Sequence, residues 1–164
     1  EFLVYEEVDE ALLLKSYMSK GLAYTMHLVL EKEAPITKEY YLKRAATAMG
    51  KTRVSNVVKN EVSKSMPDDI TIIGNTYWLN PFEAKLRINS KRMLDEIPIE
   101  ELKDGLYTIV LKNNGITEEG AFRALIKILG FSKLTDNAKK ILKDAIVYLK
   151  LDGKIIQKEE CLYI

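Results

Sequence analysis

An internal repeat constrains this sequence more than any other feature. Residues 34–50 (APITKEYYLKRAATAMG) and 114–130 (NGITEEGAFRALIKILG) both start with Ile-Thr after a turn residue and both end in glycine. Gly50 lies 14 positions after Ile36, and Gly130 lies 14 positions after Ile116. A polar helical segment follows each glycine, and a short β-type segment ends each copy. A repeat on this scale indicates a duplicated structural unit, so it is interpreted before any single motif.

The first copy predicts three helices followed by a hairpin. Apolar residues at helical spacing predict a helix over 19–33, with Ser19 as its N-cap. Thr37 is placed to cap a second helix that ends before Gly50, a residue suited to a left-handed C-terminal position. A third helix fits residues 53–66, and β-rich runs on both sides of a Gly-Asn turn predict a hairpin.

The second copy predicts the same order of elements. A helix starts near Pro98 and runs to about residue 113, and Thr117 caps the next helix. Thr135 caps a third helix over 136–151, after which Asp152-Gly153 turns the chain into a second hairpin.

These patterns predict a mainly α chain with small β-hairpins, an α+β fold built of two tandem winged-helix units. The expected division is an acidic N-terminal segment (1–18), unit 1 (19–80), a linker (81–96) and unit 2 (97–164). Units of this size lie near the lower limit for an independent core.

Charge is distributed unevenly although the net charge is only +1. Residues 1–36 carry seven acids against three lysines, residues 37–66 seven bases against two acids, and residues 131–158 seven lysines against three aspartates. Blocks of opposite sign can mark the surface that meets a partner, and they can also be the solvated faces of separate helices.

Several classes of protein are disfavoured. The single cysteine, Cys161, cannot form an internal disulfide, and the lone His27 lacks partners for a metal site or a catalytic triad. No apolar run is long enough to span a bilayer. We therefore expect a cytoplasmic, non-enzymatic chain without a cofactor, and its start at Glu1-Phe2 suggests a piece excised from a longer protein.

The third helix of each unit is the best candidate for chemistry, because the second helix of a helix-turn-helix enters the major groove of DNA. Arginine and asparagine can contact base edges, whereas lysine suits phosphates. The candidate DNA-binding residues are Lys51, Arg53, Asn56, Lys59, Asn60 and Lys64 in unit 1, and Lys133, Asn137, Lys139, Lys140 and Lys143 in unit 2. The alternative is that these side chains simply form exposed helix faces.

Two further groups of residues are candidates for contact with DNA. Tyr77 and Trp78 in the first hairpin could stack on a base as a wing, although strand alternation predicts that one of the two is a core residue. The expected linker carries cations that could add phosphate contacts, namely Lys85, Arg87, Lys91 and Arg92.

Residues 29–44 (VLEKEAPITKEYYLKR) and 115–131 (GITEEGAFRALIKILGF) resemble the C-terminal domain of unknown function of large bacterial superfamily I DNA helicases. Those proteins often also carry an endonuclease-like domain. The resemblance covers roughly residues 20–160 and implies an accessory module of a DNA-processing motor. This chain has Lys133 where the family usually has arginine, which keeps the charge but not the capacity for a bidentate hydrogen bond.

The sequence therefore predicts a non-catalytic module that docks mainly on the backbone of duplex or forked DNA, with low sequence specificity, for a larger helicase or nuclease polypeptide. The alternative is a protein-interaction or dimerisation module, in which the acidic residues 1–10 dock on a neighbour or on the module itself. A transcriptional regulator is a third interpretation, weakened by the absence of an effector domain in this sequence.

Overall fold

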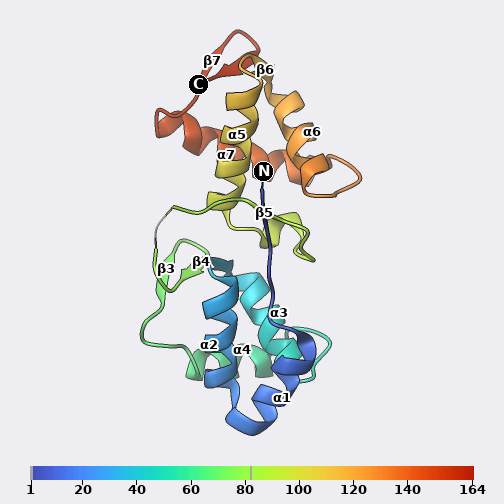
Figure 1. Cartoon of the computed structure of the whole chain (residues 1–164), viewed down its shortest axis with the longest axis vertical. Helices are drawn as coiled ribbons and strands as arrows, with labels where there is room; N and C mark the ends of the chain where they lie inside the picture. The colour runs from blue at the N-terminus through green and yellow to red at the C-terminus, as the bar shows by residue number, and fades with distance from the viewer. Residues whose placement is uncertain (1, 82) are drawn as a thin grey trace. The chain divides into compact units, whose positions relative to one another are not determined.

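The computed structural model describes residues 2–81 and 83–164, and the chain divides into two compact units. The N-terminal unit comprises residues 5–81, and the C-terminal unit comprises residues 83–164 together with residues 2–4. Both units combine helices with small sheets, so the expected α+β class is confirmed (Figure 1).

In the N-terminal unit the described elements are α1 (Glu10–Lys20), α2 (Leu22–Glu33), β2 (Ile36–Thr37), α3 (Lys38–Ala48), α4 (Asn56–Lys64), β3 (Thr71–Ile73) and β4 (Thr76–Trp78). In the C-terminal unit they are β1 (Leu3–Val4), β5 (Arg87–Ile88), the 3-10 turn η1 (Leu94–Glu96), α5 (Ile99–Lys112), β6 (Ile116–Thr117), α6 (Glu118–Ile128), α7 (Asp136–Leu151), β7 (Ile156–Lys158) and β8 (Cys161–Tyr163).

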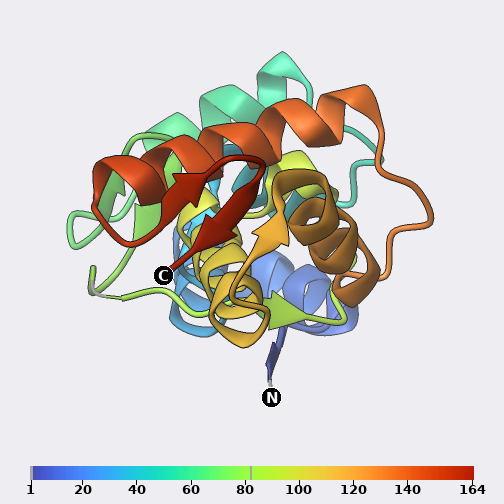
Figure 2. The ribbon, with the colours of Figure 1, turned by 90° about the horizontal axis from the view of Figure 1, so that it is seen from above.

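Both copies of the repeat form a helix, a short strand, two helices and a hairpin, and the short strand pairs with the second strand of the hairpin. The antiparallel sheets have the orders β2-β4-β3 and β6-β8-β7, with Ile36 opposite Tyr77 and Ile116 opposite Leu162. Figures 1 and 2 show the C-terminal hairpin beside α5 and α7. The sequence predicted the hairpins and missed the strands made by Ile-Thr.

The predicted threonine caps are confirmed in both copies. Thr37 accepts a hydrogen bond from the Tyr40 amide at 3.3 Å, and Thr117 accepts one from the Gly120 amide at 3.1 Å. Thr135 caps α7 in the same way, accepting from the Ala138 amide at 3.1 Å. The closing glycines of the repeat, Gly50 and Gly130, have φ angles of 69° and 83°. Such angles favour glycine, which explains why each copy ends there.

The start of the chain differs from the expectation. Ser19 lies inside α1, where its hydroxyl donates to the Lys15 carbonyl at 2.9 Å, so it is not an N-cap. Gly21, with a φ of 86°, separates α1 from α2. Residues 1–18 were expected to be a separate acidic segment, yet Leu13 of α1 is fully buried within the N-terminal unit. The acidic composition of residues 1–18 gave no indication that part of α1 packs in the core.

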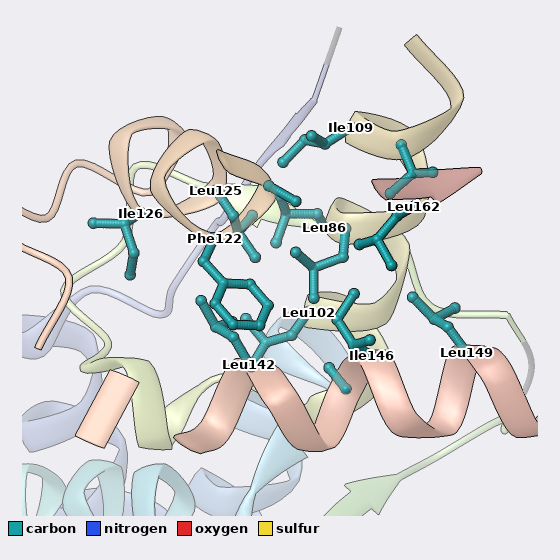
Figure 3. Close-up of a cluster of buried hydrophobic side chains, with 14 of the residues drawn as sticks. Leu86, Leu102, Ile109, Phe122, Leu125, Ile126, Leu142, Ile146, Leu149 and Leu162 are labelled. Carbon is teal, nitrogen blue, oxygen red and sulfur yellow. The ribbon is translucent and has the colours of Figure 1, made fainter. Parts of the chain in front are cut away.

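The expected linker also belongs to a core. Leu86 and Leu94 are buried in the hydrophobic cluster of the C-terminal unit, where Figure 3 shows Leu86 among side chains from α5 and α6. The third helix of the first copy is shorter than predicted, since α4 covers only Asn56–Lys64. Its counterpart α7 has the predicted bounds, and Leu142, Ile146 and Leu149 line its buried face.

A buried carboxylate holds the segment before the first repeat helix of the C-terminal unit. Glu101 of α5 is fully buried, and its Oε1 accepts from the Arg87 amide at 3.1 Å. Its Oε2 accepts from the guanidinium of Arg87 at 2.7 Å and from that of Arg92 at 2.8 Å. Arg92 also donates to the Arg87 carbonyl at 2.9 Å. Both backbone polar groups of Arg87 are thereby satisfied by side chains.

The N-terminal unit contains the same arrangement built from other positions. Glu33, fully buried at the end of α2, accepts from the Val8 amide at 3.1 Å, from Arg44 Nε at 3.2 Å and from the Tyr5 hydroxyl at 2.7 Å. Arg44 donates in turn to the Val8 carbonyl. Burial raises the pKa of Glu33, and the charge of Arg44 opposes the shift. We refer to these two arrangements as the Glu33 clamp and the Glu101 clamp.

Glu101→Gln should strongly destabilise the C-terminal unit, because it removes the buried negative charge to which Arg87 and Arg92 are both bonded. The expected decrease in the free energy of unfolding is about 3–5 kcal/mol, the range found when one partner of a buried ion pair is removed. Hydrogen exchange of the α5 amides, which reports on this unit alone, measures it. The control is Glu160→Gln, an exposed change expected to stay within about 0.5 kcal/mol. Equal protection of the α5 amides from hydrogen exchange in both variants would contradict the conclusion that the Glu101 clamp stabilises this unit.

Candidate nucleic-acid interface

The helix α4 divides its residues cleanly between the core and the surface. Val58 and Val62 are buried, and Ser55 caps the helix by accepting from the Val58 amide at 3.4 Å. The exposed surface is mostly polar, with Val57 as its apolar exception. Its polar residues are Asn56, Lys59, Asn60, Ser63 and Lys64. Four of these five residues are among the predicted DNA-binding residues.

The turn between α3 and α4 adds two more predicted residues. Lys51 and Arg53 follow Gly50 and are exposed. Among residues 2–81 and 83–164, no ion pair is formed by Lys51, Arg53 or Lys59. Lys64 lies 3.8 Å from Glu61, an exposed contact of little strength. The turn and α4 together present positive charge that the described residues leave largely uncompensated.

The predicted cations of the C-terminal unit behave differently. Lys139 lies 3.2 Å from Glu119, and Lys143 lies 3.1 Å from Glu118, so acids of α6 accompany two lysines of α7. The hydrogen bond from Lys139 is the main reason that the pKa of Glu119 is lowered. Lys133, in the segment before α7, is exposed, and so are Asn137 and Lys140 in the first turns of that helix. Part of the basic character that the sequence of this helix suggests is therefore neutralised.

The predicted wing aromatics cannot stack on a base in this structure. Tyr77 is 7% exposed, and its ring packs edge-on against Tyr41 with the centroids 5.1 Å apart. Trp78 is 4% exposed, and its indole nitrogen has no hydrogen-bond partner among the described residues. Strand alternation predicted one core residue here, but both side chains are buried. The exposed apolar residues of the hairpin are instead Ile72 and Ile73.

The expected linker cations are mostly engaged as well. Arg87 and Arg92 belong to the Glu101 clamp, and Arg92 is only 2% exposed. Lys85 lies 3.3 Å from Glu83 and 3.8 Å from Asp104. These arginines are poorly placed for the predicted phosphate contacts, because Arg92 is buried and both guanidinium groups are bonded to the Glu101 carboxylate. Counting charges along the sequence cannot reveal such pairing.

A hollow of about 700 Å³ lies between α3, α4 and the hairpin of the N-terminal unit, and no sequence pattern pointed to it. Its apolar lining consists of Leu42, Val54, Val62, Met66, Ile72 and Tyr77. Its polar lining consists of Lys38, Glu39, Lys43, Lys59, Ser63 and Asn75. Two residues predicted to contact DNA therefore border this hollow, Lys59 of α4 and the wing residue Tyr77.

The acidic start of the chain is bound to its own unit. Glu7 accepts a hydrogen bond from the Tyr40 hydroxyl at 3.0 Å, while Tyr5 and Val8 are held by the Glu33 clamp. The hypothesis that residues 1–10 dock on the module itself agrees with these contacts for residues 5–8.

His27 has acidic neighbours that explain its position. Its Nε2 lies 3.1 Å from Asp69 and its Nδ1 lies 2.9 Å from Glu31, so the ring joins α2 to the segment before β3. No group of histidine, cysteine and carboxylate side chains within the described residues could hold a metal ion. The helices of the described ranges are too short or too polar to cross a bilayer.

Comparisons of the chain with protein-family models, with curated proteins and with solved structures found no match.

His27 should titrate above its ordinary pKa of 6.5, chiefly because of its hydrogen bond to Asp69. A raised pKa means that the contact stabilises the fold below about pH 6.5 and that this contribution disappears as the pH rises through the folded-state value. His27 is the only histidine, so its imidazole NMR signals can be followed without ambiguity. Asp69→Asn should return the midpoint toward 6.5, whereas the matched control Asp68→Asn should leave it raised. Identical titration midpoints of His27 in the two variants would contradict the attribution of the raised pKa to Asp69.

Proposed function

We propose that this chain is a non-catalytic DNA-binding module and that the N-terminal unit makes the principal contact. The observation that carries the proposal is the group of exposed cations Lys51, Arg53 and Lys59, which lie around the start of α4 without ion-pair partners among the described residues. A positive surface lacking internal counter-charges attracts phosphates by releasing the counterions bound to DNA.

The order of elements supports a winged-helix interpretation of both units. In each, a short strand lies between the first and second helices of the repeat, and a hairpin follows the third helix. In such a unit α4 is the recognition helix, placed to enter the major groove. The hairpin β3–β4 would then act through its backbone and the exposed Ile73, since the Tyr77 ring is in the core and Ile72 lines the hollow.

The side chains on α4 support docking on the DNA backbone with limited base contact. Lysines bind phosphates without reading sequence, whereas asparagine can make a bidentate contact with adenine. Asn56 and Asn60 share the exposed face of α4 with Lys59. We therefore expect modest sequence preference, carried by the N-terminal unit. The C-terminal unit would contribute backbone contacts through Lys133 and Lys140.

The resemblance of residues 29–44 and 115–131 to a helicase C-terminal domain supports a wider role as an accessory module. In that role the chain would hold duplex or forked DNA for an attached cytoplasmic helicase or nuclease. The module itself would need no cofactor, because the motor would supply the nucleotide chemistry.

Fluorescence anisotropy with duplex and forked DNA at two salt concentrations tests the proposal. Reversing two charges with Lys51→Glu and Arg53→Glu should weaken binding at least about tenfold. It should also reduce the slope of log K against log salt by roughly 0.9 for each phosphate that the variant no longer neutralises. The matched control is Lys32→Glu with Lys127→Glu, two exposed residues that lie outside the recognition helices. Equal weakening in both double variants, or no binding at low salt, would contradict the proposal.

A second candidate function is self-association or protein binding through the C-terminal unit. Val147 and Leu151 lie four residues apart on one face of α7 and are 44% and 77% exposed. Apolar side chains at this spacing can form one side of a helix-mediated interface.

Light scattering over a range of concentrations tests this second candidate. If the unit dimerises through α7, Leu151→Glu should convert the dimer to monomer. Ile164→Glu, an exposed apolar position at the chain end, serves as its control. A chain that is monomeric at every concentration would rule out self-association.

A further inference from the structure

We propose that the hollow beside α4 is a docking groove for an acidic, apolar segment of a partner protein. This proposal goes beyond DNA binding: the groove lies on the side of α4 that faces α3 and the hairpin, and Lys59 borders both surfaces. The hollow, about 700 Å³, is called the α3–α4 groove below. This volume lies within the range of roughly 300–1,000 Å³ that ligand sites occupy in proteins.

The floor of the α3–α4 groove suits aliphatic side chains. Leu42 comes from α3, Val62 from α4 and Ile72 from β3, so three elements contribute apolar walls. Met66 adds a flexible thioether side chain, which adapts to varied partners. Ile72 is 55% exposed. An amphipathic peptide that laid its apolar face here would bury this surface, which is the usual mode of helix-in-groove recognition.

The rim of the groove is positive. Lys38, Lys43 and Lys59 line it, against the single carboxylate of Glu39. That carboxylate accepts a hydrogen bond from the Asn75 side chain, which ties it to the hairpin. Lys59 forms no ion pair among the described residues, and the rim as a whole carries more positive than negative charge. Charge complementarity therefore selects a partner segment that carries aspartate or glutamate beside its apolar residues.

In the other copy of the repeat, ion pairs join the equivalent helices α6 and α7. Eighty positions later, Glu39 and Lys59 correspond to Glu119 and Lys139, which lie 3.2 Å apart and join α6 to α7. Lys38 and Ser63 correspond to Glu118 and Lys143, which form a second bridge at 3.1 Å. The N-terminal copy cannot form the second bridge, since lysine and serine stand there. The C-terminal unit thus has two ion pairs at this place. In the N-terminal unit Lys59 forms no ion pair among the described residues.

The lining favours a protein over a nucleic acid as the occupant. Single-stranded nucleic acids bind by stacking bases on exposed aromatic rings. The one aromatic residue of the groove, Tyr77, is packed against Tyr41, and the rest of the apolar lining is aliphatic or methionine. The acidic residues at the start of this chain are not the occupant, because Glu7 is bound to Tyr40 and Val8 is held by the Glu33 clamp.

A displayed library of random peptides about 15 residues long, selected on the full chain, tests the proposal. Enriched peptides should combine leucine, isoleucine, methionine or phenylalanine with several acidic residues. In anisotropy measurements, the double variant Lys38→Glu with Lys43→Glu should lower the affinity for the best peptide at least about tenfold. Ile72→Ser should lower that affinity about fivefold. The matched control Ile73→Ser should change nothing, since Ile73 is similarly exposed on the same strand and does not line the groove.

Separate variants distinguish this groove from the DNA surface. Arg53→Glu should weaken DNA binding and spare the peptide, whereas Ile72→Ser should weaken peptide binding and spare DNA. Methyl NMR of Ile72 and Val62 should respond to the selected peptide. The proposal is overturned if no acidic, apolar peptide is enriched, or if the peptides bind the groove variants as well as the wild type. It is also overturned if duplex DNA, and no peptide, shifts those methyl signals.

Discussion

The architecture of both units depends on a buried glutamate–arginine pair that grips one residue of the segment before the repeat. In the N-terminal unit Glu33 and Arg44 bind the N–H and C=O of Val8, and in the C-terminal unit Glu101 and Arg92 bind those of Arg87. Buried backbone polar groups must be hydrogen-bonded, and here side chains supply part of that bonding. Val8 lies outside regular structure, whereas Arg87 belongs to β5, which also pairs with β1. Since a buried ion pair adds little net stability but is costly to break, each clamp mainly fixes where its segment lies.

The clamps explain why neither unit begins where the repeat begins. Once Val8 is held, Leu13 of α1 is placed in the core of the N-terminal unit, and once Arg87 is held, Leu86 is placed in the core of the C-terminal unit. Units of this size have little apolar surface to bury, so these added side chains enlarge marginal cores. The third helix of each copy then rests on a completed core. The exposed face of this third helix differs between the two copies. The cations near α4 are largely unpaired among the described residues, whereas two lysines of α7 form ion pairs.

Local chemistry made much of the fold predictable from the sequence. The threonine caps, the closing glycines and the apolar period of α7 are determined by neighbouring residues, and all were placed correctly. The errors came from long-range contacts. Glu33 and Val8 are 25 residues apart, and nothing near Glu7 in the sequence reveals that the acidic segment is clamped. The short Ile-Thr strands were missed because they exist only through pairing with a distant hairpin.

The candidate site was predictable to the same degree. Helical spacing placed Asn56, Lys59 and Asn60 on one exposed face, as the structure has them. Spacing alone could not show that Arg92 is buried against Glu101 or that Lys143 lies beside Glu118, because both pairings depend on how elements pack. The α3–α4 groove was missed for the same reason, since its lining comes from two helices and a hairpin.

An amide chemical-shift map of the whole chain, titrated with a short DNA duplex, would locate the DNA-binding surface most directly. We expect the largest changes on residues 50–64, with Lys51, Arg53 and Asn56 foremost, and smaller changes on residues 133–143. Changes concentrated on α7, or spread evenly over both units, would contradict the proposal that the N-terminal unit makes the principal contact with DNA.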